Sequence, residues 1–306
     1  MSTAAPIQFE QLKKSYGETV AVDGLSLEVQ AGEIFGMIGP DGAGKTTAMR
    51  VACGLLLPDA GRVLITGRDS AKDTMRVKEH LGYMPQRFSL YPDLTVSENL
   101  RFFADMFGVS PQERVLREKR LMQFSRLDPF RDRRAGKLSG GMKQKLALSC
   151  ILIHTPDVLI LDEPTTGVDP VSRQEFWYIL KELAKEGKAL LVSTPYMDEA
   201  QLCHRIALMH RGKIIATGTP DEVTKQFKRK LIEVSGSDLH RARKVLLEIE
   251  HEGVDVNRFG DRLHVIYDSP EQAKSLKNRV AGMNVSIEEI APTIEDTFVS
   301  LMSSAG

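Results

Sequence analysis

The stretch from Gly39 to Thr47, GPDGAGKTT, constrains the fold more than any other part of the sequence. It matches the pattern GxxxxGK[ST], whose glycines let backbone N–H groups close around phosphates at the N-terminus of a helix. A strand-like run, IFGMI, precedes it and a helix-like run, AMRVACGLL, follows it. Because strand, loop and helix come in the order that this motif requires, we favour a phosphate-binding loop over a chance glycine-rich turn.

Each position of this loop has an expected role. We expect Lys45 to reach the β- and γ-phosphates of a nucleotide and Thr46 to bind Mg²⁺. The loop as a whole would cradle the phosphates. Its predicted binding residues are Gly39, Gly42, Ala43, Gly44, Lys45, Thr46 and Thr47.

A magnesium ion at such a loop also needs a carboxylate at the end of a neighbouring buried strand. The stretch VLILDEP supplies one, because Asp162 follows four apolar residues. We expect Asp162 to hold Mg²⁺ through water and Glu163 to polarise the attacking water as a general base. A strand followed by acidic residues is common by itself, so this prediction depends on the phosphate loop.

The apolar runs divide the chain into two predicted domains, at residues 1–227 and 228–306, beside the basic stretch QFKRK. In the first, runs such as IFGMI, VLIL and ALLVS alternate with helical patterns, which predicts an α/β fold with a mainly parallel sheet. In the second, KLIEV, RLHVIY and VSIEEI alternate with helices over 238–250 and 269–280 and a last helix, TIEDTFVSLM. This pattern predicts a small α+β domain. Its best-marked helix begins with the N-cap, proline and capping-box residues Ser269, Pro270 and Gln272.

Composition excludes several classes of function. The 41 basic residues balance the 41 acidic ones, so we expect no nucleic-acid partner. No apolar run approaches about 18 residues and no secretory signal is present, which predicts a cytoplasmic chain that spans no membrane. The isolated Cys53, Cys150 and Cys203 indicate buried thiols in a reducing compartment rather than a zinc site or disulfides.

A second glycine-containing motif decides the family. Residues 138–144 read LSGGMKQ and precede an apolar helical pattern. Ser139, Gly140 and Gly141 would form another helix N-terminus with free backbone donors, which could bind a phosphate. The alternative for this motif alone is an ordinary N-cap serine before a core helix.

GPDGAGKTT, LSGGMKQ and ILDEP in this order resemble the ATP-binding subunit of an ABC transporter. The resemblance covers residues 1–227. It implies a P-loop NTPase core, a helical signature subdomain at about residues 87–155, and ATP with Mg²⁺ as the ligands. It also implies that two such domains sandwich two ATP molecules head to tail, so that LSGGMKQ of one chain completes the site of the other.

Further residues match this family's motifs. Tyr16 in KSYGETVAV resembles the aromatic residue that stacks on adenine, although an ordinary surface tyrosine is the alternative. Gln86 in GYMPQ resembles the glutamine that senses Mg²⁺ and water and links to the membrane subunit. FSLYPDLTVSENL, which follows, resembles the region that contacts the membrane partner. Asp169 in TGVDP resembles the aspartate that crosses the dimer interface.

Two stretches narrow the resemblance to exporters of the drug-resistance type. They are LYPDLTVSENLRFFADMFGV and the tail APTIEDTFVSLM. The implied function is ATP hydrolysis coupled to transport through transmembrane permease subunits, with a second ATP-binding subunit, the same or different, as partner. The implied location is the inner face of the cell membrane, and the implied role of the small C-terminal domain is subunit pairing or regulation.

One position departs from the family. After ALLVS the family normally has STHxxxEA, whose histidine hydrogen-bonds the γ-phosphate and the attacking water, whereas this chain reads STPYMDEA. Pro195 has no side-chain donor and no backbone N–H, so it cannot make that contact. His204 and His210 follow, and ordinary surface or packed histidines are the favoured interpretation for both rather than replacements for the missing donor.

Three hypotheses follow from Pro195. The chain pairs with a different ATP-binding subunit and lends it LSGGMKQ, or it forms a homodimer that hydrolyses ATP slowly with Glu163 and Gln86, or it only binds ATP to control assembly. The intact Glu163 counts against the last.

A fourth hypothesis is a soluble ABC ATPase that acts on ribosomes or DNA. It is disfavoured, because ribosome-acting relatives usually carry two ATP-binding domains and DNA-repair relatives insert a long coiled coil between Lys45 and Ser139.

Overall fold

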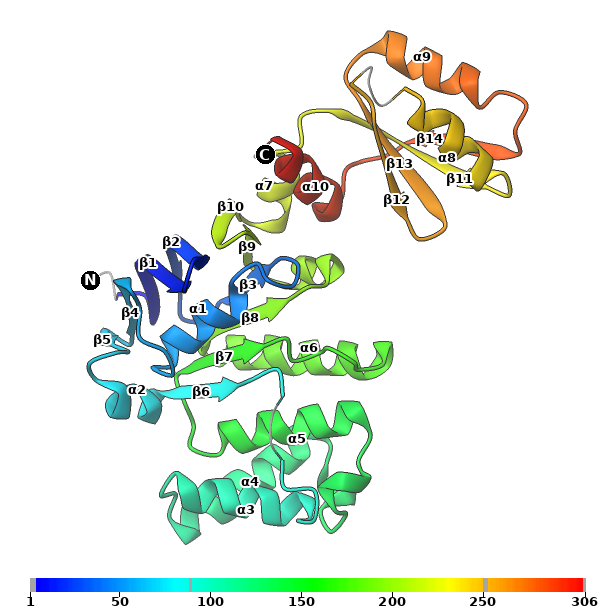
Figure 1. Cartoon of the computed structure of the whole chain (residues 1–306). Helices are drawn as coiled ribbons and strands as arrows, with labels where there is room; N and C mark the ends of the chain where they lie inside the picture. Colours follow the sequence, from blue (N-terminus) through cyan, green and yellow to red (C-terminus); the bar gives the residue numbers. More distant parts are fainter. Residues whose placement is uncertain (1–3, 88–89, 250–252, 305–306) are drawn as a thin grey trace. The chain divides into compact units, whose positions relative to one another are not determined.

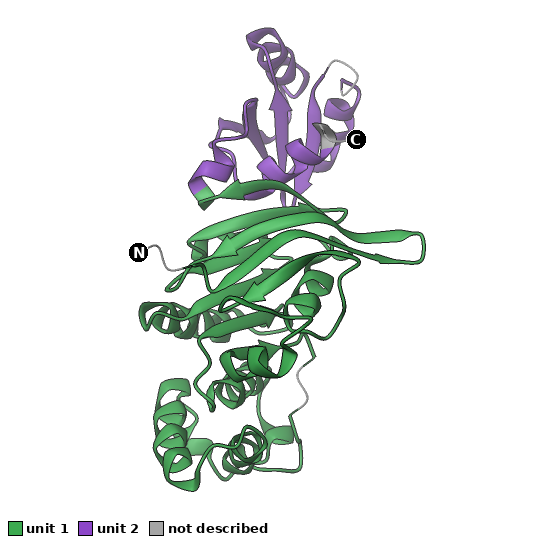
Figure 2. Cartoon of the chain, turned by 90° about the vertical axis from the view of Figure 1, so that its left-hand side faces the viewer, with its two compact units in different colours: residues 1–220 green, residues 221–306 purple. Residues whose placement is uncertain are grey.

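The computed structural model describes residues 4–87, 90–249 and 253–304. The chain forms two compact units, residues 1–220 and 221–306, which Figure 2 colours separately. The division after Pro220 falls earlier than the predicted domain end at residue 227. Phe227 is buried against Leu231 and Ile266 of the second unit.

The larger sheet of the first unit, in its described residues, has six strands in the order β10-β9-β3-β8-β7-β6 (Figure 1). They are β3 (Ile34–Ile38), β6 (Leu81–Met84), β7 (Val158–Asp162), β8 (Ala189–Thr194), β9 (Arg205–His210) and β10 (Lys213–Gly218). β3–β8, β3–β9, β6–β7 and β7–β8 pair in parallel and β9–β10 antiparallel. Every residue of β3, β7 and β8 is buried, as expected for strands covered on both faces. The predicted α/β fold with a mainly parallel sheet is confirmed.

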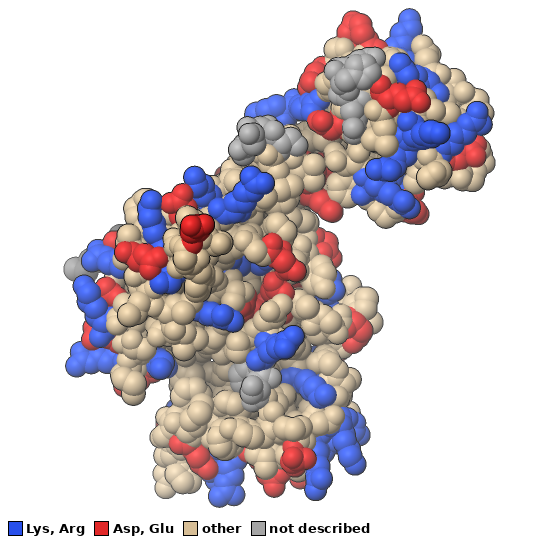
Figure 3. All heavy atoms as spheres, in the orientation of Figure 1, with Lys and Arg blue, Asp and Glu red and all other residues tan. Residues whose placement is uncertain are grey.

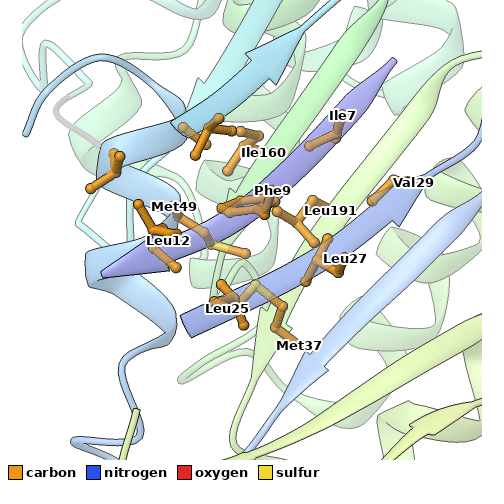
Figure 4. Close-up of a cluster of buried hydrophobic side chains, with 14 of the residues drawn as sticks. Ile7, Phe9, Leu12, Leu25, Leu27, Val29, Met37, Met49, Ile160 and Leu191 are labelled. Atoms are coloured by element: carbon orange, nitrogen blue, oxygen red, sulfur yellow. The ribbon is translucent and has the colours of Figure 1, made fainter. Parts of the chain in front are cut away.

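An antiparallel sheet, β2-β1-β4-β5, packs against this core. Its strands are β1 (Ile7–Tyr16), β2 (Thr19–Val29), β4 (Ala60–Ile65) and β5 (Arg68–Asp69). Figure 4 shows a cluster of apolar side chains from several elements. It contains Phe9 of β1, Leu25 of β2, Met37 of β3, Leu191 of β8 and Met49. Met49 belongs to α1 (Lys45–Ala52), so this apolar cluster holds the helix that follows the phosphate loop.

A group of helices follows β6 in the chain. α3 (Val96–Met106) and α4 (Pro111–Ser125) both pack on α5 (Gly140–Leu152) (Figure 1). Thr95 forms a capping box with Glu98, and Ser110 caps the helix that begins at Pro111, so local sequence fixes both helix starts. The remaining helical segments of this unit are α2 (Thr74–His80), η1 (Asp128–Phe130), η2 (Ala135–Lys137), α6 (Pro170–Lys185) and η3 (Met197–Leu202).

The second unit has a β-α-β-β-α-β order after α7 (Pro220–Thr224) and closes with α10 (Ile294–Ser304). Its antiparallel sheet has the order β12-β13-β11-β14. The elements are β11 (Lys230–Gly236), α8 (Leu239–Leu247), β12 (Asp255–Phe259), β13 (Arg262–Tyr267), α9 (Pro270–Arg279) and β14 (Val285–Glu289). The predicted capping box of Ser269 and Gln272 is present. α8 ends before the expected residue 250, which lies outside the described residues.

The distribution of charged side chains, the helices and the cysteines can be compared with the composition of the chain. In the face drawn in Figure 3, acidic and basic side chains are interspersed over both units. Among the residues that the structure describes, no helix combines the length and the apolar character needed to cross a bilayer. Cys53, Cys150 and Cys203 are buried free thiols, and burial raises the pKa of all three.

Candidate active site

The phosphate loop lies between β3 and α1, where the sequence predicts it. Two of its glycines are required by close approaches of backbone. A Cβ on Gly39 would lie 2.4 Å from Met209 O, and one on Gly44 would lie 2.2 Å from Ala21 O. Gly44 also has φ +102°, in the left-handed region that favours glycine. A side chain at either position would collide with the backbone of another segment, so the loop can follow this path only with glycine there.

Lys45 is the first residue of α1 and is only 4% exposed. Its Nζ donates hydrogen bonds to Gly39 O at 2.7 Å and Pro40 O at 3.0 Å. The same ammonium lies 3.6 Å from the Glu163 carboxylate. A buried cation is thus held on the inner side of the loop, where it can exchange carbonyl partners for phosphate oxygens.

Asp162 ends β7 and is 1% exposed. Its Oδ1 accepts hydrogen bonds from Thr46 Oγ1 at 3.1 Å and from Ser193 Oγ at 2.6 Å. Its Oδ2 is buried and has no partner in the described residues. A buried carboxylate oxygen without a partner is costly, so this atom fits a ligand such as hydrated Mg²⁺. Thr46 and Asp162 together could therefore hold the metal.

Glu163 follows directly and is 6% exposed. Its φ is +50°, which is uncommon for a residue other than glycine and is typical of functional turns. The backbone N–H of Glu163 donates to Ser193 O at 3.2 Å and Ser193 Oγ at 3.0 Å. Its Oε2 accepts from Gln86 Nε2 at 2.8 Å and from Thr166 Oγ1 at 3.3 Å. The carboxylate is therefore held in one orientation beside Lys45.

Sequence reasoning missed the contribution of Ser193. Its backbone is in register with Asp162 in the parallel pairing of β7 and β8, and its hydroxyl contacts both acidic residues in turn. The only signal in the sequence is a polar residue near the end of the apolar run ALLVS. The pairing of β7 with β8 gives this residue its place, and no local motif reveals it.

A cleft of about 490 Å³ opens over the phosphate loop. Tyr16 lines it and is 48% exposed, so the ring is available for stacking. The structure brings Tyr16 and Gln86 together with the loop and the general-base candidate. The lining residues are Tyr16, Thr19, Val20, Ala21, Asp41, Gly42, Ala43, Gly44, Lys45, Thr46, Thr47, Gln86 and Glu163.

The residues of LSGGMKQ do not line this cleft. Ser139 caps α5 and accepts a hydrogen bond from the backbone N–H of Met142. A Cβ on Gly141 would lie 2.4 Å from the hydroxyl oxygen of Ser172, so this glycine lets α5 approach α6. Asp169 caps α6, and the backbone N–H of Ser172 holds the pKa of the Asp169 carboxyl below its usual range. The described residues of the motif therefore lie outside the lining of this cleft.

Pro195 lies beside the phosphate loop. It is half-buried and follows Thr194, whose carbonyl accepts a hydrogen bond from Gly39 N at 3.4 Å. His204 is elsewhere, because its Nδ1 accepts a hydrogen bond from Ile34 N at the beginning of β3, the end of the strand opposite to the loop. His210 ends β9. Phe88 and Ser89 of the predicted membrane-partner region lie outside the described residues.

Comparisons with known proteins point to one family. The sequence pattern of the family described as "ABC transporter" matches residues 22–166. The probable multidrug ABC transporter ATP-binding protein YbhF of Escherichia coli strain K12 is 40% identical over 94% of this chain, which spans 50% of that protein. Nod factor export ATP-binding protein I of Burkholderia thailandensis is 38% identical over 98% of this chain and 97% of its own length. A crystal structure of the ADP conformation of an ATP-binding cassette from an ABC transporter is similar with a TM-score of 0.64 and 28% identity, over 72% of this chain and 93% of that one.

Proposed function

This chain belongs to the ATP-binding proteins of the ABC transporter family, and we propose that it binds and hydrolyses ATP to power an exporter. The observation that carries the proposal is Asp162, whose Oδ1 bonds Thr46 and whose buried Oδ2 has no partner among the residues that the structure describes. A buried carboxylate with one oxygen that lacks a hydrogen-bond donor is expected where a metal–nucleotide complex binds and completes the site.

The residues around the cleft have complementary tasks in this mechanism. Lys45 and the loop N–H groups bind the phosphates, and Tyr16 stacks on the base. Thr46, Gln86 and Asp162, the last through water, would hold Mg²⁺, which would supply charge neutralisation to the bound nucleotide. Glu163 accepts a proton from the attacking water, and Gln86 keeps the Glu163 carboxylate in the orientation for this transfer.

Partners are proposed from the separation of the two motifs. Ser139, Gly140 and Gly141 do not line this chain's own cleft, so they would serve the cleft of a second ATP-binding subunit, with Asp169 at the interface. Relatives named for multidrug transport and Nod factor export support the export direction. Transmembrane permease subunits would hold the pair at the inner face of the membrane.

Pro195 sets the expected rate. Thr194 O accepts a hydrogen bond from Gly39 N of the loop, and the proline that follows Thr194 has no side-chain donor for a γ-phosphate. Glu163, Gln86 and Lys45 are intact, so we propose slow hydrolysis by the chain's own residues. Loss of one positioned donor lowers a rate on the order of 100-fold. The alternative is that ATP is hydrolysed only in the cleft of a different ATP-binding subunit that pairs with this chain.

The test is steady-state MgATPase activity of the purified chain, with binding of a fluorescent ATP analogue measured in parallel. We expect Glu163→Gln to lower the rate at least ~100-fold and to keep ATP binding. We expect Pro195→His to raise the wild-type rate about 10- to 100-fold. A wild-type chain that binds ATP without turnover, and that Pro195→His does not activate, would contradict slow hydrolysis and would favour the partner's site.

A further inference from the structure

Glu199 is a buried carboxylate that the mechanism above does not use. It lies in η3 and is 1% exposed. Its Oε1 accepts a hydrogen bond from Thr165 Oγ1 at 2.7 Å, and its Oε2 accepts one from Thr194 Oγ1 at 2.6 Å. Arg173 Nε lies 3.6 Å from Oε1 and supplies the opposite charge. We call the hydrogen-bonded residues Glu199, Thr165 and Thr194 the Glu199 brace.

The choice of a carboxylate at this position needs a reason. Burying a charge carries a desolvation cost, and well-packed apolar residues often serve stability equally well. What a carboxylate adds is two acceptor oxygens that point to two different segments of the chain. Glutamine has one acceptor oxygen, so in a glutamine variant one of the two threonine hydroxyls would lose its acceptor.

The first of these segments carries the general base. Thr165 is itself buried and stands two positions after Glu163, whose φ of +50° has to be maintained by its surroundings. Within this turn Thr166 N donates to Glu163 O at 3.3 Å and Val168 N donates to Thr165 O at 3.1 Å. The bond from Thr165 to Glu199 anchors this turn to another part of the fold.

The second segment carries position 195. Thr194 is the last residue of β8, and its Oγ1 also accepts a hydrogen bond from Tyr196 N at 3.0 Å, across Pro195. Its carbonyl accepts from Gly39 N at the start of the phosphate loop. Arg173 reinforces the arrangement, because its guanidinium stacks over the Tyr196 ring with 4.4 Å to the centroid.

We propose that Glu199 is a positioning residue for ATP hydrolysis, which fixes the turn of Glu163 relative to position 195 by bonding Thr165 and Thr194 at once. The inference rests on the proposed function, since it assumes that Glu163 acts on a phosphate in the cleft. Glu199 itself does not line that cleft. Its effect is therefore on turnover and not on the affinity for ATP.

Kinetics separate this role from general stabilisation. We expect Glu199→Ala to lower kcat about 10- to 100-fold while KM for ATP changes less than about twofold. Glu199→Gln should fall between this variant and the wild type, because it keeps one acceptor. The matched control is Asp198→Ala, whose side chain is 75% exposed and lies 3.7 Å from the same Arg173. A folded Glu199→Ala chain with wild-type kcat would overturn the proposal.

The link to position 195 is tested by combining substitutions. A histidine at position 195 can act only when its backbone is held, so Pro195→His should raise kcat in the wild-type background and have little effect in the Glu199→Ala background. An equal gain in both backgrounds would show that the brace does not position residue 195.

A measurement without turnover keeps the two proposals distinguishable. Hydrogen exchange measures how well the backbone N–H groups of Glu163 and Tyr196 are protected. These groups donate hydrogen bonds to Ser193 O and Thr194 Oγ1, in the segments that Glu199 joins. We expect faster exchange at both in Glu199→Ala and wild-type exchange in Asp198→Ala. If the wild-type chain fails to hydrolyse ATP, slow hydrolysis is refuted, and unchanged exchange at these two amides would separately refute the brace.

Discussion

Two aspartates, one in each unit, are buried to the same degree and differ in what surrounds them. Asp162 and Asp296 are each 1% exposed. Asp296 Oδ1 lies 2.6 Å from His264 Nδ1, and its Oδ2 accepts from the backbone N and the hydroxyl of Thr293 at 2.8 and 2.6 Å. Asp162 has donors on Oδ1 only, and its Oδ2 has no partner in the described residues.

The difference separates a structural acid from a functional one. A carboxylate with both oxygens satisfied has completed its bonding within the fold, and removing it should weaken the fold. A buried carboxylate with a free oxygen is costly in the protein alone and becomes satisfied when a ligand arrives. Asp162 should therefore matter for activity and Asp296 for stability.

Asp162→Asn should reduce activity strongly. Weaker metal binding should lower MgATP hydrolysis about 100-fold, and the Mg²⁺ concentration for half-maximal activity should rise. The melting temperature should not fall, because the substitution removes a buried charge that lacks a full set of partners. Titration of activity with Mg²⁺ and a thermal melt measure both quantities.

The control for this experiment is Asp157→Asn, at an exposed carboxylate that pairs with His80. Hydrolysis should remain at the wild-type level in that variant. Loss of stability in Asp162→Asn with unchanged hydrolysis would reverse the assignment of Asp162 as the functional acid.

Local motifs could be predicted from the sequence because neighbouring residues determine them. The phosphate loop needs Gly39 and Gly44 where backbones approach closely, and the helix that begins at Pro270 needs Ser269 and Gln272 three positions apart. The capping atoms of that helix are close in the chain. The phosphate loop was recognised from its local pattern, although the backbones that approach Gly39 and Gly44 belong to the distant Met209 and Ala21. The parallel sheet followed from buried strands with continuous apolar runs, whose pattern is itself local.

Contacts between distant segments could not be predicted in this way. Ser193 contacts Asp162 because β8 pairs with β7, and Glu199 contacts Thr165 across 34 positions of sequence. Phe227, at the predicted end of the first domain, is likewise buried against Leu231 of β11 and Ile266 of β13. The roles assigned to the cleft residues stay predictions until activity is measured.

A smaller effect is expected from Asp296→Ala, which tests the other acid. His264 lies on β13 and would lose the carboxylate at Nδ1, although Glu233 Oε2 remains 3.6 Å from its Nε2. The second unit should lose about 2 kcal/mol of unfolding free energy, the scale of a buried hydrogen bond to a charged group. ATP binding should be unchanged.

Hydrogen exchange over residues 255–304 at increasing urea concentration measures this loss within the second unit. Asp261→Ala is the control, because that side chain is 97% exposed, and its effect should stay within about 0.5 kcal/mol. If Asp296→Ala kept the stability of the second unit and lost ATP binding, hydrogen bonds on both carboxylate oxygens would not identify a structural aspartate.

His154 is a polar residue that resembles Asp162 in one respect. Its Nδ1 is also buried without a partner in the described residues, although His154 does not line the cleft. Nε2 lies 3.3 Å from Leu81 O, and the ring stacks on Phe107 with centroids 3.9 Å apart. Burial lowers the pKa of His154 to about 4. The unpartnered nitrogen is thus tolerated because the ring stays neutral, and no ligand is needed to explain it.

The sign of the resulting pH dependence follows from this lowered pKa. The unfolded chain, with an ordinary histidine pKa of about 6.5, binds a proton before the folded chain does, so stability falls as the pH drops from about 6.5 to 4. Because the ring is partly exposed, we expect this to cost about 1 kcal/mol between pH 7 and pH 5. His154→Gln should remove this share of the acid sensitivity, whereas His240→Gln, at an exposed histidine, should leave it in place. Urea unfolding at pH 7 and pH 5 measures the difference, and an unchanged slope in His154→Gln would mean that the buried nitrogen has a partner in solution.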